Sequence, residues 1–187
     1  MPLHDWNEQT EWETVHKYWI TELGRWLKPR LPAEYRVALA TVDPARAVHV
    51  TRAGMLVVVI ELVSPRNKDR PETRRSTTDR FLGYLTHGVH LLLVDVHGRP
   101  AGFSFADDLA AALMFPSPSV PAPCAVSYRM GGPAPQAGAG HLLALWRRPL
   151  TVGAPLPTLP LALTPDSSVL VDLEQTYMRA ATDAYLP

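Results

Sequence analysis

The sequence contains a single cysteine, Cys124, among its 187 residues. One cysteine cannot form an internal disulfide and cannot supply the thiolates of a structural zinc cluster. The chain also lacks an excess of charge of either sign, since Lys plus Arg and Asp plus Glu both total 18. Without an overall basic excess, any binding to nucleic acid would have to come from a local patch.

Long apolar runs are absent as well. No run approaches the roughly 20 residues needed to span a bilayer, and residues 1–8 lack the basic and apolar regions of a secretory signal. We therefore expect a cytoplasmic protein with no membrane segment. The seven histidines form no paired metal-binding motif. Glycine-rich phosphate loops and nucleophile elbows are missing too.

The length predicts one domain, residues 1–187, because domains usually contain roughly 100 to 200 residues. Within it we expect a core at 10–97, followed at 98–187 by a proline-rich β extension and a closing helix. Of the 19 prolines, 11 lie between residues 116 and 165. Proline is tolerated in loops and at strand edges. The exposed strand edges of such an extension are able to pair with a second copy of the chain, so a homodimer is one expectation.

The spacing of apolar residues predicts the elements of the core. From Trp12 to Leu27 they recur at helical spacing, and Pro29 ends the helix. Three short strands joined by hairpin turns are then expected at 35–41, 45–51 and 55–63. A helix from Pro71 to about His87, with Gly88 as a left-handed cap, precedes a buried strand at 89–96. Since a helix joins the last two strands, they are expected to lie parallel with a right-handed crossover.

The extension shows a different pattern. Residues 125–130 and 141–147 alternate between apolar and polar, which is typical of paired antiparallel strands. A short edge strand is expected at 169–172 and a final helix at 173–185. No repeat with a period of 20 to 50 residues is present, which excludes a solenoid.

Glu61 interrupts the strand predicted at 55–63, which is otherwise apolar on both faces and therefore central in the sheet. A carboxylate in such a strand costs several kcal/mol unless it is paired, protonated or bound to a cation. Glu61 therefore marks a candidate site.

The predicted order of helix, three strands, helix and strand resembles the restriction-endonuclease-like core of the PD-(D/E)XK superfamily. More closely, the phrase IELVSPRNK, with a helix and then GVHLLLVDV, resembles the proteins grouped as domain of unknown function 4058. The opening MPLHDW, the phrase RPLTVGAPLPTLPLAL and the ending VLVDLEQTYMRAA are similar to that family's ends. The Uma-type putative endonucleases carry a similar Glu-x-x-Ser-Pro strand end.

The resemblance implies a site for a divalent cation, Mg²⁺ or Mn²⁺. In such folds an Asp on the second strand and an acid on the third bind the ion, and a nearby Lys activates water. Glu61 matches the third-strand acid, and Asp43 is the nearest replacement for the second-strand Asp. Lys68 matches the Asn-Lys pair of the family. The simple pattern places the catalytic lysine where Val63 stands, so Lys68 serves in that role only if its loop folds back.

The resemblance also implies a polar loop that faces phosphate. Ser64 and Asn67 match polar positions of the family, and Arg80 stands where relatives carry Lys but is still able to clamp phosphate. Residues 66–80, which include Arg70, hold six basic residues against three acids. They form either a surface for nucleic acid or a solvated helix face with internal Glu–Arg pairs.

Three explanations of Glu61 follow. In the first, the protein keeps a nuclease-like fold with a degenerate metal site and serves as a binding or accessory protein. In the second, it is an active Mg-dependent nuclease or phosphodiesterase. In the third, Glu61 is a structural carboxylate paired with Arg80 or Lys68.

Overall fold

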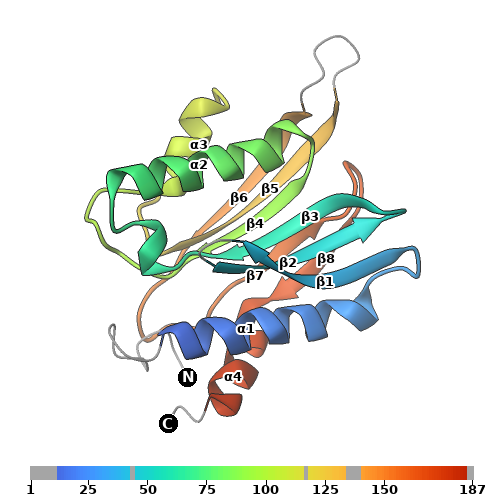
Figure 1. Cartoon of the computed structure of the whole chain (residues 1–187), viewed down its shortest axis with the longest axis horizontal. Coiled ribbons are helices and arrows are strands. Elements are labelled where there is room, and N and C mark those ends of the chain that lie inside the picture. Colours follow the sequence, from blue (N-terminus) through green and yellow to red (C-terminus); the bar gives the residue numbers. More distant parts are fainter. Residues whose placement is uncertain (1–11, 43–44, 116–117, 134–139, 185–187) are drawn as a thin grey trace.

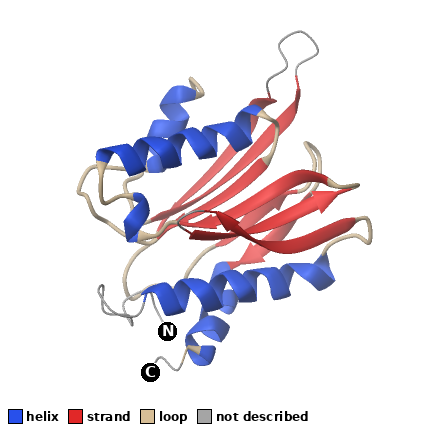
Figure 2. Ribbon diagram, in the orientation of Figure 1, coloured by secondary structure: helices blue, strands red, loops and turns tan. Residues whose placement is uncertain are grey.

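The computed structural model describes residues 12–42, 45–115, 118–133 and 140–184. It has an α/β fold with one mixed sheet of six strands in the order β1-β2-β3-β4-β5-β6 and a second sheet that pairs β7 with β8 (Figures 1 and 2). The strands are β1 (Tyr35–Val42), β2 (Ala45–Arg52), β3 (Met55–Leu62), β4 (His90–Asp95), β5 (Cys124–Pro133), β6 (Gly140–Pro149), β7 (Thr158–Ala162) and β8 (Ser168–Asp172). The helices are α1 (Trp12–Leu27), α2 (Pro71–Thr86), α3 (Phe105–Ala112) and α4 (Leu173–Asp183), with short 3-10 helices η1 (Lys28–Arg30) and η2 (Pro65–Asn67).

The first half of the chain has the predicted element order of helix, three strands, helix and strand. β1, β2 and β3 form an antiparallel meander, and β3 then pairs in parallel with β4. α2 makes the crossover between these two strands. It ends before Gly88, whose φ of +76° confirms the predicted left-handed position.

Each face of the large sheet is covered by helices, and each has its own apolar core. α1 and α4 pack with β7 and β8 on one face, around buried residues such as Trp19 and Tyr177. α2 and α3 cover the other face, where Phe81 and Phe105 meet edge to face. The tryptophans of α1 are therefore core residues: Trp19 donates a hydrogen bond to Thr176 of α4 at 3.0 Å.

The proline-rich half differs from the prediction. β5 and β6 were expected in an extension packed on the core, but β5 pairs antiparallel with β4, so the two strands continue the main sheet. Only β7 and β8 stand apart as a small sheet. α3 was not predicted because eight residues are too few for a clear helical period, and β7 was not predicted because it contains Pro160, which is disfavoured inside a strand. The closing helix α4 ends at Asp183.

None of the helices in residues 12–42, 45–115, 118–133 and 140–184 combines the length with the apolar content that crossing a membrane requires.

Candidate functional site

The candidate site lies where the parallel strands β3 and β4 end. Side chains alternate between the two faces of a strand, so Glu61 shares a face with Val59 and Val63, and Asp95 shares one with Leu93. These three apolar neighbours all belong to the core under α2 and α3. The two acids therefore lie on the same face of adjacent strands, at the edge where parallel sheets usually place a ligand site.

Glu61 is paired with a cation of its own. Its side chain is 1% exposed, and Arg80 Nη2 on α2 lies 3.1 Å from Glu61 Oε2. Burial raises the pKa of Glu61 to about 7, although the charge and hydrogen bond of Arg80, followed by Tyr84, act to lower it. Arg80 is thus one of the two partners that the third explanation proposed. Tyr84 follows Arg80 by one helical turn, a spacing that places both side chains over the same part of the sheet.

Lys68 pairs with the second acid, Asp95, and not with Glu61. Lys68 Nζ lies 2.6 Å from Asp95 Oδ2, and both side chains are 2% exposed. Lys68 Nζ also donates a hydrogen bond to the His97 carbonyl oxygen at 2.5 Å, and the His97 amide donates to Asp95 Oδ1 at 3.2 Å. Burial raises the pKa of Asp95 to about 6 against the opposing effect of Lys68. Lys68 is therefore held by two acceptors, the Asp95 carboxylate and the His97 carbonyl oxygen.

The turn that brings Lys68 back to β4 is built by Ser64 and Asn67. The Ser64 amide donates to Asn67 Oδ1 at 2.8 Å, and Ser64 Oγ accepts from the Arg66 amide at 3.4 Å, which completes a capping box around η2. Asn67 is 1% exposed and its Nδ2 lies 3.5 Å from the hydroxyl of Thr77 on α2. Ser64 and Asn67, for which the resemblance implied a role toward phosphate, thus stabilise the turn.

The second-strand acid of the predicted metal site has no counterpart on β2. Asp43 lies outside the described residues. In the antiparallel register of β2 and β3, the residue opposite Glu61 is Ala47, which is fully buried and carries no carboxylate. Among the described residues, no three side chains of the His, Cys, Asp and Glu types come together as metal ligands.

Most basic residues of segment 66–80 already contact other groups of the protein. Of its six basic residues, four already contact other groups of the protein: Arg66, Lys68, Arg74 and Arg80. Arg70 and Arg75 are exposed. The acids of the same segment, Asp69, Glu72 and Asp79, are exposed as well. The solvated-face interpretation therefore describes this segment better than a phosphate-binding surface does.

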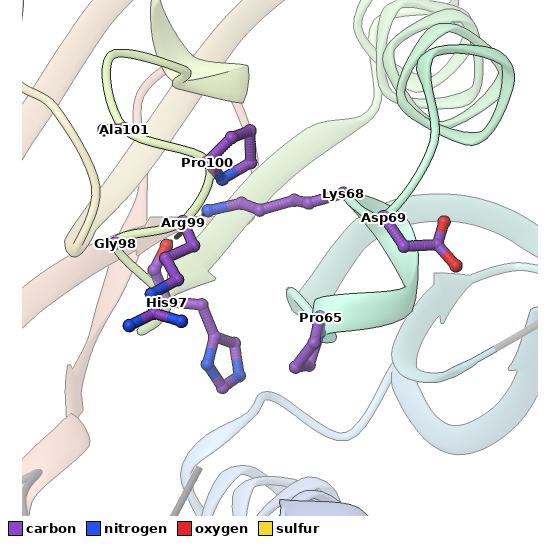
Figure 3. A pocket seen from close by; sticks show the side chains of 8 residues that line it. All are labelled: Pro65, Lys68, Asp69, His97, Gly98, Arg99, Pro100 and Ala101. Carbon is purple, nitrogen blue, oxygen red and sulfur yellow. Dashed lines mark hydrogen bonds between the residues drawn. The ribbon is translucent and has the colours of Figure 1, made fainter. Parts of the chain in front are cut away.

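A cavity of about 600 Å³ opens beside the Lys68–Asp95 pair, between η2 and the segment that follows β4. Figure 3 shows the Lys68 side chain crossing from η2 toward Arg99 and Pro100, while the Asp69 carboxylate points away from it. Besides Lys68, which is paired with Asp95, the lining contains one positive residue, Arg99, and one negative residue, Asp69. These two charges balance, so the cavity has no strong preference for a cation or an anion. Sequence reasoning did not predict this cavity, because residues 97–101 carry no recognisable motif.

Comparison of the chain with protein-family models, curated proteins and solved structures found no match.

Proposed function

We propose that this protein has a restriction-endonuclease-like core with a degenerate metal site, and that it serves as a binding or accessory protein and not as a nuclease. The order of the first six elements supports the kinship, as does the parallel pairing of β3 with β4 across α2. So does the position of Glu61 near the carboxyl end of an otherwise apolar central strand.

The proposal that the metal site is degenerate rests on one observation: each buried acid at the strand ends already forms an ion pair with a cation of the protein. Arg80 holds Glu61 and Lys68 holds Asp95. Mg²⁺ and Mn²⁺ bind to ionised carboxylates, and here a neighbouring cation already balances the charge of each acid, so an ion would have to compete with that cation. With Ala47 opposite Glu61 and Val63 in the position of the usual lysine, the described residues do not fit a catalytic ion.

The alternative is an active Mg- or Mn-dependent nuclease. The observation that favours it is the placement of two acids on the same face of adjacent parallel strands. It requires the ion to compete with Arg80 and Lys68 for these carboxylates, and Asp43 to complete the ligand set.

Calorimetric titration of Mn²⁺ and Mg²⁺ distinguishes the two functions without knowledge of the substrate. We expect no saturable binding by the wild type, by Glu61→Gln or by Asp95→Asn. The matched control is Glu72→Gln, which removes an exposed acid of α2. Saturable binding by the wild type and by Glu72→Gln that disappears in Glu61→Gln would overturn the proposal, above all if the same proteins cleaved nucleic acid with Mn²⁺.

Nucleic acid remains a proposed partner of segment 66–80, and the contacts of its basic residues set the expected strength. Only Arg70 and Arg75 are free of the internal contacts described above, so we expect weak binding with a shallow dependence on salt, because the number of phosphates contacted sets that slope. Fluorescence anisotropy with a labelled oligonucleotide measures it. Tight binding that persists at high salt would contradict this expectation.

A further inference from the structure

A second cleft, of about 300 Å³, lies at the amino-terminal end of α1. It is bounded by the first turns of α1, by the end of β1 at Thr41, by the start of β2 at Arg46, and by η2. The position of α1 there is fixed by the buried His16, whose Nε2 donates a hydrogen bond to the Leu62 carbonyl oxygen at 3.1 Å. In Figure 1 this end of α1 lies on the same side of the molecule as the short helix that follows β3.

Three cations from three different elements converge on this cleft: Lys17 of α1, Arg46 of β2 and Arg66 of η2. The lining residues include one carboxylate, Glu13, which forms an ion pair with Arg66. The side chains of that pair are 66% and 72% exposed, so the contact contributes little and competes weakly with a ligand. Three cations against one acid leave the cleft with a net positive charge.

Lys17 and Arg46 make no ion pair with any residue of the described part of the chain. Some other arginines are used differently: Arg80 and Arg147, for example, each form an ion pair with an acid. Three like charges that converge beside a single acid repel one another, and an anion in the cleft would reduce that repulsion.

His16 adds no positive charge to the cleft, whereas two neighbouring hydroxyl groups are able to contact an anion. Burial lowers the pKa of His16, and the positive charge of Arg46 lowers it further. The hydrogen bond to the Leu62 carbonyl oxygen acts in the opposite direction and raises it. The hydroxyls of Thr41 and Ser64 line the cleft and are able to donate. Trp12 forms an apolar part of the wall and meets the His16 ring edge to face at 5.5 Å.

We propose that this cleft binds the phosphate group of a small phosphorylated molecule. Guanidinium groups bind phosphate oxygens through paired donors, and Lys adds a mobile point charge. The volume lies at the lower end of the range of about 300 to 1,000 Å³ that is typical of small-molecule sites, which favours a compact ligand. The cleft does not include Glu61 or Asp95, so this proposal is independent of the metal site.

The test is calorimetric titration of the full chain with inorganic phosphate and with phenyl phosphate. We expect saturable binding of both, and affinity about tenfold weaker for each of Arg46→Gln and Lys17→Gln, because each variant removes one charge-assisted contact. Both residues are exposed, so their replacement leaves the fold intact, which circular dichroism verifies. The control is Arg148→Gln, which removes an exposed charge on β6 and should bind phosphate like the wild type.

Each contrary result is distinguishable. No saturable binding of either probe by the wild type would overturn the proposal, as would equal weakening by all three variants, which indicates a general effect of net charge. Much tighter binding of a single-stranded oligonucleotide, weakened equally by Arg75→Gln, would show a nucleic-acid surface instead. Unchanged phosphate affinity in Glu61→Gln is the further expected result, and it separates this site from the strand-end acids.

Discussion

The protonation of Glu61 gives the sharpest prediction, and Glu61→Gln is the change that tests it. Gln has nearly the same shape as protonated Glu and cannot ionise, so the variant isolates the free energy of the charge. The carboxyl group is 1% exposed, and burial raises its pKa to about 7 from an ordinary value of 4.5 despite the neighbouring Arg80 and Tyr84. Desolvation therefore outweighs the ion pair.

The sign of the pH effect follows from proton linkage. Because the pKa is higher in the folded state than in the unfolded chain, the folded protein binds more protons between these two pKa values. The stabilisation from protonated Glu61 is full below pH 4.5 and is lost as the pH rises through about 7. Such a shift corresponds to about 3 kcal/mol, since one pKa unit is worth about 1.4 kcal/mol.

Urea denaturation of the wild type and Glu61→Gln at pH 4.5 and pH 8.5 measures this difference. We expect similar stability at the lower pH and a relative gain of about 3 kcal/mol for the variant at the higher pH. For a chain of this size, that gain corresponds to a melting temperature higher by about 6 to 12 °C. Glu72→Gln, which removes an exposed acid, should show no comparable change.

The opposite outcome has an equally clear meaning. If the contact with Arg80 outweighed burial, the pKa of Glu61 would lie below 4.5, and the variant would lose stability relative to the wild type as the pH rose through that range. That result, or identical pH dependence of the two proteins, would refute the reasoning.

Three further predictions concern stability. Lys68→Met leaves Asp95 buried without a counter-charge and should cost about 3 to 5 kcal/mol, most of it recovered by adding Asp95→Asn. Ser64→Ala removes the acceptor of the capping box and should cost about 1 kcal/mol. Gly88→Ala should cost about 1 to 2 kcal/mol through its φ of +76°, whereas Gly83→Ala, inside α2 with open space around its Cβ, should stabilise by up to about 1 kcal/mol.

Chemical denaturation at pH 7 measures all three. An additive loss in the Lys68 and Asp95 double variant would contradict the buried pair. Unchanged stability of Ser64→Ala would show that the Asn67 side chain alone holds the turn. Equal effects at Gly88 and Gly83 would remove the argument from backbone conformation.

The fold of the first half was predictable because its signals are local. Apolar spacing from Trp12 to Leu27 and the apolar runs of β3 and β4 predict elements without any knowledge of their neighbours. The second half was less predictable. Whether β5 joins β4 or packs elsewhere depends on pairing between strands far apart in the chain, which alternation alone does not specify.

The candidate site shows the same division. The sequence predicted Glu61 as a buried acid that needs an explanation, and Arg80 as one of two possible partners. It did not predict that Lys68 would pair with Asp95, because the contact depends on the return of η2 to the end of β4. Nor did it predict the cleft of Lys17, Arg46 and Arg66, whose three elements are separated along the chain.

The sequence by itself therefore determined which residues are costly to bury, since that cost belongs to the side chain and its strand. The tertiary structure alone decided which cation meets each acid and which cations make no ion pair within the described part of the chain. The physical reason is that ion pairing falls off within a few ångströms, so the outcome depends on contacts that only the folded chain creates.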